Sequence, residues 1–435
     1  MNSLSVLLAL LVPQAQDAAP PVPGTAVVVA EVARQIEARY VLVEEAPRIA
    51  ERLREKAGTG AYDGSRTPEG LAEALTSDLR AFSHDLHFAV EHDPERAARL
   101  LAAGAGTSPQ LPDLGHTAEE LERMRLSNYG FRRVEMLSGN VALIELAEFD
   151  DLAVAQPTAA AAMAFAAHAD AVIFDIRGNP GGWGNTVGFL VSYFLPADLE
   201  LTSMFDRETG ETTVSRTLAT VPGQRMLEAP LFVLTGPSTG SAAEAFAFTL
   251  QLMGRATIVG QRTVGAAQGG GWVPVGDGFV VFIPSFRSFD PKTGRNWEGS
   301  GVLPDAETAV DRALETAHWR AVAALDARAT RQDLRWLLPL LELAAKGPAG
   351  RDVNGLAGRY EGIEISAVGG ALKFLGASGV LRDMVPLSDG TFLIEDASVP
   401  AMHQARVRFI SDGEGAISGL ELLTAEGDVI PRPRR

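Results

Sequence analysis

The stretch at residues 231–271, LFVLTGPSTGSAAEAFAFTLQLMGRATIVGQRTVGAAQGGG, constrains the fold of this 435-residue chain most strongly. Its apolar start at 231–234 predicts a buried strand, a glycine-containing turn follows, and a helix begins at Ser241. Glu244 follows three residues later, and Ser-x-x-Glu ahead of an apolar helix is the pattern of a capping box. Acyl-transfer enzymes also place nucleophiles at such a position, because N–H groups of the first turn favour an oxyanion. Ser241 is therefore a cap or a nucleophile, and the local sequence alone favours the cap.

The amino-acid composition excludes several classes of binding partner and of reactive site. The formal net charge of −17 argues against nucleic acid and anionic membrane surfaces as partners. The chain contains no cysteine, which excludes a disulfide framework, a thiolate zinc site and a thiol nucleophile. The length suffices for two or three domains with a sizeable core.

The first residues predict an exported protein, periplasmic or extracellular. An apolar run at 4–12 precedes small and polar residues, which is typical of a signal peptide over 1–19 with cleavage within 14–19. The run is too short to span a bilayer, so we expect no membrane span after signal removal. The segment ahead of the run lacks Lys and Arg, and a disordered start is the alternative.

The hydrophobic pattern predicts four regions after the signal peptide. Residues 20–125 show mainly helical spacing and form an N-terminal helical domain. Residues 126–328 alternate strand and helix patterns, as an α/β core does, and 329–352 form a helical linker. Residues 353–435 switch to short alternating runs separated by glycine, which predicts a small antiparallel β accessory domain.

Two serines compete for the role of nucleophile in the central stretch. Gly-Pro-Ser-Thr-Gly is a literal G-x-S-x-G around Ser238, the pattern of an α/β-hydrolase elbow. That elbow needs an acid and then a histidine downstream, where only His318 and His403 remain. Pro237 also restricts a turn that must be unusually tight. The elbow at Ser238 is therefore disfavoured.

A glycine-rich turn, Asp175-Ile-Arg-Gly-Asn-Pro-Gly-Gly182, follows another predicted buried strand. It lacks the spacing of the known phosphate-binding loops. Adjacent glycines free backbone N–H groups to point at a ligand, as an oxyanion hole requires, whereas a purely structural turn is the alternative. Asp175 and Arg177, two residues apart at the strand end, are placed to brace the turn.

The order and spacing of three motifs carry a resemblance that no single motif does. The DIRGNPGG turn, the TGPSTGSAAEAFA helix with its GRATIVGQRTVGA tail, and the NWEGSGVLPD segment follow one another. Together they resemble the tail-specific, or C-terminal processing, serine peptidase family over roughly 125–310, and more loosely over 27–95. The resemblance implies a crotonase/Clp-protease-like α/β core, here with a helical N-terminal segment and the small antiparallel β C-terminal domain.

The details favour one branch of that family. The processing-protease branch pairs its serine with a lysine in the glycine-rich loop, here 264–271, and carries a PDZ domain. Ala266 stands where that lysine would fall, no lysine lies between Ser241 and Lys292, and no PDZ-sized insert precedes the core. The tricorn-core and interphotoreceptor-retinoid-binding-protein-like branch fits better.

Three residues carry the chemistry that this resemblance implies. Ser241 would be the nucleophile, His87 the base and Glu298 the acid that orients it, although a lone glutamate is ordinarily a solvated surface residue. The segment SHDLHFAVEHDP holds both candidate bases, and alternating apolar residues predict a strand over 86–90. His84 competes with His87, which we prefer because Asp-Leu-His-Phe matches the Asp-x-His-Leu form of the motif.

The predicted activity is a serine-type peptidase acting on peptides or unfolded proteins through an acyl-enzyme. The oxyanion would be held by the N–H of Ala242 and one from Gly181 or Gly182. No cofactor and no metal is expected, because the three histidines near residue 87 do not form an H-E-x-x-H pair. The oligomeric state is left open.

Two other functions remain as alternatives on the same fold. The retinoid-binding-like branch also includes binding proteins for apolar ligands without proteolysis, which bound lipid in the purified protein would reveal. A crotonase-like acyl-thioester enzyme shares the oxyanion logic and predicts coenzyme A binding, for which no motif is present.

Overall fold

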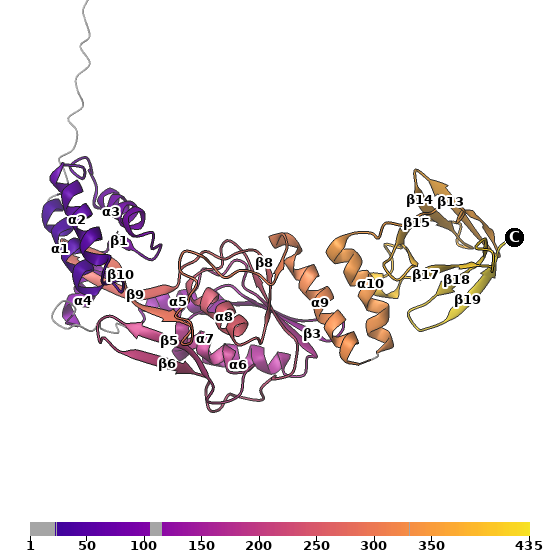
Figure 1. Ribbon diagram of the computed structural model, residues 1–435, viewed down its shortest axis with the longest axis horizontal. Coiled ribbons are helices and arrows are strands. Elements are labelled where there is room, and N and C mark those ends of the chain that lie inside the picture. Colours follow the sequence, from indigo (N-terminus) through magenta and orange to yellow (C-terminus); the bar gives the residue numbers. More distant parts are fainter. Residues whose placement is uncertain (1–21, 23, 105–114, 330) are drawn as a thin grey trace, which may run out of the picture. The chain divides into compact units, whose positions relative to one another are not determined.

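The computed structural model describes residue 22 and residues 24–104, 115–329 and 331–435. The predicted signal peptide at 1–19 lies outside this part. The chain divides into two compact units (Figure 1). The first contains the described residues up to 115 with segments 205–211 and 268–287; the second contains the described residues of 116–204, 212–267 and 288–435. Each is described by itself.

The first unit is helical, with a small sheet. Its helices are α1 (Thr25–Arg39), α2 (Ala46–Gly58), α3 (Pro68–Ser83) and α4 (Pro94–Ala102). Thr67 caps α3 by accepting a hydrogen bond from the Gly70 N–H, and Pro68 occupies the first turn. The apolar faces of α1 to α3 pack on the sheet, with a core that includes Val32, Ile36, Ile49, Leu53, Leu75, Leu79, Phe88, Val273 and Val281.

The sheet of this unit corrects two predictions. Strand β1 (Ala89–His92) begins after His87 and pairs with β10 (Phe279–Phe289). The glycine-rich stretch predicted as a loop up to residue 271 is instead strand from Gln268, as β9 (Gln268–Gly276), antiparallel to β10. Glycine is needed there because a Cβ on Gly270 would lie 1.8 Å from the Ile283 oxygen. Segment 205–211 joins β5 (Glu200–Asp206) to β6 (Thr212–Arg216).

The core of the second unit is a six-stranded sheet in the order β11-β8-β7-β4-β3-β2. All its pairs are parallel except β2 with β3. The parallel strands read as apolar runs because helices cover both faces. The strands are β2 (Phe131–Leu137), β3 (Val141–Leu146), β4 (Ala171–Asp175), β7 (Leu231–Thr235), β8 (Thr257–Gly260) and β11 (Ala306–Glu307).

Alternate residues of the strands face two cores. Ala142, Ile144 and Leu146 pack with residues of α6 (Leu152–Ala166), α7 (Gly184–Val191) and α8 (Ser241–Leu252). Val141 and Leu143 pack with α9 (Ala313–Arg328) and α10 (Gln332–Lys346). The predicted α/β core is confirmed. The unit also contains α5 (Ala118–Leu126) and the short 3-10 turns η1 (Asn128–Gly130) and η2 (Val310–Arg312).

The C-terminal residues of the second unit form an eight-stranded antiparallel sheet with neighbours in chain order. Its first and last strands meet at a bridge between Tyr360 and Arg434, so the sheet closes on itself around an apolar interior. The strands are β12 (Gly358–Tyr360), β13 (Ile363–Val368), β14 (Ala371–Leu375), β15 (Leu381–Pro386), β16 (Phe392–Ile394), β17 (Arg406–Ser411), β18 (Ile417–Leu423) and β19 (Val429–Pro433), with η3 (Ala401–His403) between them.

A buried arginine joins this sheet to α10. The Arg406 side chain lies 3.8 Å from the centroid of the Trp336 ring and donates a hydrogen bond to the Trp336 carbonyl. Burial lowers the pKa of Arg406 to about 10.

Candidate active site

The turns after β4 and β7 lie at the same edge of the sheet because both strands are parallel, and they hold each other. The Thr239 hydroxyl donates to the Ile176 carbonyl at 2.8 Å, and the Gly240 N–H donates to the Asn179 carbonyl at 3.0 Å. The two predicted turns are thus one structure, and α8 starts from it.

Ser241 begins α8 in a strained conformation. Its φ is 48°, in the left-handed region, which costs a residue with a side chain about 1–2 kcal/mol. The helix cap is Gly240, and the Ser241 N–H donates to Glu244 Oε2 at 2.9 Å. The structure thus places the helix cap one residue before the predicted position, and the glutamate half of the predicted capping box is present.

Glu244 connects the serine to the segment after β8. This carboxylate is fully buried and also accepts hydrogen bonds from the Thr263 hydroxyl and from the N–H groups of Gly265 and Ala266. Burial raises the pKa of Glu244, and these hydrogen bonds oppose the rise. The sequence pattern predicted Glu244 only as a capping residue; a single acidic residue on an otherwise apolar helix is the signal for this additional role.

The glycine turn fits closely against Ser241. A Cβ on Gly181 would lie 2.7 Å from the Ser241 Cβ and 3.1 Å from the Ala242 nitrogen. Gly181 and Gly182 have φ of 125° and 128°, a region that side chains rarely allow. The Gly181 N–H donates to Asn179 Oδ1 at 2.8 Å, which leaves the N–H groups of Gly182 and Ala242 as the candidate oxyanion donors.

The predicted brace of this turn is confirmed. Arg177 Nε donates to Asp175 Oδ1 at 2.8 Å, and its Nη2 donates to Oδ2 at 2.6 Å. A further bond runs from Arg177 Nη1 to the carbonyl of Val310. The hydrogen-bonded Asp175 carboxylate raises the pKa of Arg177.

A buried aspartate borders the glycine turn. The Phe149 N–H donates to the Gly181 carbonyl at 2.8 Å, and the next residue, Asp150, is 1% exposed. Within the described residues neither Asp150 carboxylate oxygen has a hydrogen-bond partner. Burial, followed by the charge of Glu148, raises the pKa of Asp150.

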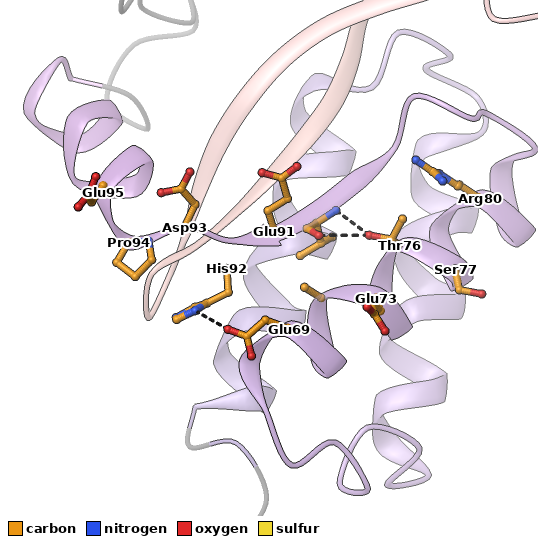
Figure 2. Close-up of a pocket in the computed structure, with 12 residues that line it drawn as sticks. Glu69, Glu73, Thr76, Ser77, Arg80, Glu91, His92, Asp93, Pro94 and Glu95 are labelled. Atoms are coloured by element: carbon orange, nitrogen blue, oxygen red, sulfur yellow. Dashed lines mark hydrogen bonds and ion pairs between the residues drawn. The ribbon is translucent and has the colours of Figure 1, made fainter. Parts of the chain in front are cut away.

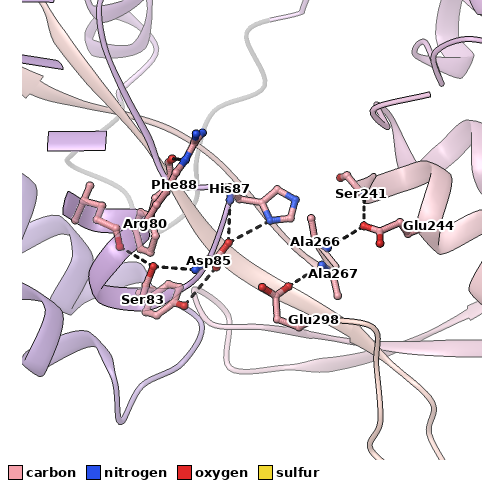
Figure 3. Close-up of polar contacts among 12 residues, drawn as sticks. Arg80, Ser83, Asp85, His87, Phe88, Ser241, Glu244, Ala266, Ala267 and Glu298 are labelled. Carbon is pink, nitrogen blue, oxygen red and sulfur yellow. Dashed lines mark hydrogen bonds and ion pairs between the residues drawn. The ribbon is translucent and has the colours of Figure 1, made fainter. Parts of the chain in front are cut away.

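Glu298 lies on the segment that Glu244 also holds. Its Oε2 accepts a hydrogen bond from the Ala267 N–H at 2.7 Å, and the indole of the buried Trp297 donates to the Ala266 carbonyl at 3.0 Å. Contacts thus run from Ser241 through Glu244 and the 266–267 segment to Glu298, all within the second unit (Figure 3).

Both candidate bases belong to the first unit and differ in setting. His84 ends α3 with a φ of 60°, and its side chain is exposed. His87 has a side chain only 14% exposed, and its Nδ1 lies 3.2 Å from Asp85 Oδ1 (Figure 3). The structure therefore gives His87, but not His84, the carboxylate contact that a general base uses.

A cavity of about 1090 Å³ opens elsewhere in the first unit, between α3 and β1 (Figure 2). Acidic side chains dominate its wall, and the His92 Nδ1 lies 3.6 Å from Glu69 Oε1. None of the predicted site residues lines it. Its lining residues with titratable side chains are Glu69, Glu73, Arg80, Glu91, His92, Asp93 and Glu95.

Two searches over the described part of the chain gave negative results. No group of three or more His, Cys, Asp or Glu side chains there could hold a metal ion. No helix in the same residues is long and apolar enough to cross a membrane.

Comparison with known protein families tests the predicted resemblance to the tail-specific serine peptidases. The model of peptidase family S41 matches residues 140–308. Residues 140–308 thus resemble a peptidase S41 domain. The model for the N-terminal domain of this peptidase in eukaryotic IRBP matches residues 23–125. The predicted resemblance to the tail-specific serine peptidases, in the retinoid-binding-protein-like branch, is thereby confirmed.

The chain has similar curated relatives. A carboxyl-terminal-processing protease of Picosynechococcus sp. is 32% identical over 32% of this chain and 31% of the relative. The chloroplastic carboxyl-terminal-processing peptidase 3 of Arabidopsis thaliana is 29% identical over 31% of this chain and 25% of the relative. The chain thus spans about a third or less of these relatives' length. A solved photosystem II D1 C-terminal processing protease has a TM-score of 0.42 at 18% identity, covering 67% of this chain and 94% of that one.

Proposed function

We propose that this chain is a serine peptidase with Ser241 as nucleophile, His87 as general base and Glu298 as the acid of the set. The observation that carries the proposal is the strained backbone of Ser241 at the head of α8, against the Gly181 turn. Strain of this kind persists only where the surroundings impose it, and it gathers at active sites. The proposal requires His87 to reach the Ser241 hydroxyl.

The proposed reaction follows the two-step course of serine peptidases. His87 takes the hydroxyl proton while Ser241 Oγ attacks the peptide carbonyl, and then gives the proton to the leaving amine. A water molecule then attacks the ester while His87 takes its proton, and His87 returns this proton to Ser241 Oγ as the ester bond breaks and the second product leaves. A histidine suits this exchange because its ordinary pKa of about 6.5 lies close to neutral pH.

The oxyanion of each tetrahedral intermediate is assigned to the N–H groups of Ala242 and Gly182. The Ala242 N–H belongs to the first turn of α8, where the helix dipole favours negative charge. Removing one such donor typically costs about 2.7–4 kcal/mol of transition-state stabilisation.

Ala266 supports a histidine rather than a lysine as the base. Its N–H donates to Glu244 and its carbonyl accepts from Trp297, so the backbone of this position is fixed while its side chain carries no amine. A Ser–Lys dyad has no ammonium group available at this position.

The substrates that fit this proposal are peptides or unfolded proteins. The curated relatives are named processing proteases, and the matched family is a peptidase family. An exported location follows from the apolar run at 4–12, and it stays a proposal together with the signal peptide.

Covalent labelling with a fluorophosphonate probe tests the nucleophile. Ser241→Ala should abolish labelling, whereas Ser238→Ala, which changes the neighbouring serine of the same turn, should retain it. Undiminished labelling of Ser241→Ala would sink the assignment. Lipid that copurifies with an unlabelled protein would favour the apolar-ligand alternative, to which the match to the IRBP N-terminal domain lends some support.

A further inference from the structure

We infer that Asp85 is a positioning residue that orients the His87 imidazole. This inference rests on the proposed function and adds a carboxylate to it. The His87 Nδ1 lies 3.2 Å from Asp85 Oδ1, and the His87 backbone N–H donates to the same oxygen at 2.9 Å (Figure 3). One carboxylate oxygen thus fixes both the backbone and the ring of the histidine.

Asp85 is itself held firmly. It is 1% exposed, and its Oδ2 accepts a hydrogen bond from the hydroxyl of Tyr40, which directly follows α1, at 3.3 Å. Its N–H donates to Ser83 Oγ at 3.0 Å, and that hydroxyl donates to the Leu79 carbonyl at 2.8 Å in the last turn of α3. Tyr40 at the end of α1 therefore holds the Asp85 carboxylate, and Ser83 at the end of α3 holds the Asp85 backbone.

The contact selects one form of the imidazole. An ionised carboxylate only accepts hydrogen bonds, so the imidazole must donate through Nδ1–H. Its Nε2 then keeps the lone pair that a general base needs. The same carboxylate stabilises the imidazolium that forms when His87 takes a proton. Asp85→Asn removes the carboxylate and allows the other tautomer.

Asp85 and Glu298 differ in what they contact. Glu298 Oε2 binds the Ala267 N–H within the second unit, whereas Asp85 lies two residues before His87 in the same turn. The Asp85–His87 pair thus forms within a single unit. We assign the Nδ1 contact to Asp85, and Glu298 then acts as the second carboxylate of the site.

The first test is a histidine titration that needs no catalysis. Protein with ¹⁵N-labelled histidine and Ser241→Ala is titrated by NMR, and His87→Gln identifies the His87 resonances. We expect neutral His87 to carry its hydrogen on Nδ1 while Asp85 is present, and Asp85→Asn to admit the form with the hydrogen on Nε2. A neutral His87 that carries its hydrogen on Nε2 would overturn the inference without any variant at position 85.

The second test is the pH profile of fluorophosphonate labelling. Asp85→Asn should slow labelling by roughly 10²–10⁴-fold and shift the low-pH side of the curve of labelling rate against pH. Asp85→Glu should restore part of the labelling rate. Asp78→Asn is the matched control, because Asp78 is another buried aspartate of this unit that accepts from a tyrosine, Tyr62, at 2.7 Å. This control should retain the profile of the unchanged protein.

The outcomes separate the two proposals. Labelling of Asp85→Asn at the unchanged rate and profile, with Ser241→Ala unlabelled, would remove Asp85 and leave the serine peptidase standing. Absence of any Ser241 adduct in the unchanged protein would remove the proposed function, and the titration would still decide the Asp85–His87 contact.

Discussion

At the scale of single residues, the site depends on positions where the backbone permits little choice. Ser241 keeps a left-handed φ because its own N–H is bound by Glu244 and the preceding Gly240 N–H is bound by Asn179. Gly181 packs against it with no room for a side chain. These contacts hold the serine at the start of α8, next to Ala242 in the first turn of the helix.

A methyl group at Gly181 should disrupt this arrangement. Gly181→Ala puts a Cβ 2.7 Å from the Ser241 Cβ at a φ of 125°, so the serine or the turn must move. A displacement of about 1 Å can cost a factor of about 100 in rate, and we expect at least that loss in fluorophosphonate labelling. Gly178→Ala, in the same turn with open space around it, should label normally; equal rates for both variants would refute the packing argument.

The burial of Asp150 predicts that replacing its carboxylate stabilises the protein in a pH-dependent way. Its carboxylate is buried with no partner in the described chain, and its raised pKa means that the folded state binds the proton more tightly than the unfolded state. The contribution of Asp150 is therefore full below the unfolded pKa of about 3.9 and is lost as the pH rises through the folded pKa. Asp150→Asn should stabilise the protein at pH 7 by about 1 kcal/mol.

Urea unfolding at several pH values checks this sign. The difference in the free energy of unfolding between Asp150→Asn and the unchanged protein should shrink towards zero near pH 4. A difference that grows as the pH falls would contradict the account.

At the scale of elements, the sequence predicted the helices and strands that a local hydrophobic pattern determines. It missed the strand that depends on pairing with a distant strand. The strand, turn and helix from Leu231 to Leu252 follow from one apolar run, a glycine turn and helical periodicity. Strand β9 could not be predicted from its own residues, because glycines form a strand there only through the close approach of β10. Similarly, residues 86–87 of the expected strand form a turn, in which the His87 N–H donates to the Asp85 side chain.

Gly270→Ala tests the close approach of β9 to β10. The new Cβ would meet the Ile283 carbonyl at 1.8 Å, and the strands must separate locally, which should destabilise the protein by about 1–3 kcal/mol. Gly58→Ala at the end of α2 has open space around it and should be neutral or slightly stabilising. Thermal unfolding of the pair measures the difference, and equal melting temperatures would contradict the pairing.

At the scale of the whole molecule, the order of the motifs predicted the S41 family, whereas the contacts within the site came only from the structure. Glu244 and Asp85 were visible in the sequence as parts of motifs, but their partners are set by tertiary packing. The chain places His87 in one compact unit and both Ser241 and Glu298 in the other. Sequence periodicity carries no information on which residues far apart in the chain share a site.

The proposed triad predicts that residues 87 and 241 can be cross-linked. The chain has no cysteine of its own, so His87→Cys with Ser241→Cys introduces a single pair of thiols. Dibromobimane, which fluoresces when it bridges two nearby sulfurs, should label the double variant and neither single variant. A folded double variant whose thiols both react with maleimide, without bridging, would contradict a shared site.

The most direct measurement compares the two histidines by the rate at which Ser241 forms a fluorophosphonate adduct, followed by intact mass. His87→Ala should slow the reaction by roughly 10²–10⁴-fold, because Ser241 loses the base that removes its proton. His84→Ala, an exposed position at the end of α3, should stay within about twofold of the unchanged protein. An adduct on Ser241 that forms at the unchanged rate in His87→Ala would contradict the account.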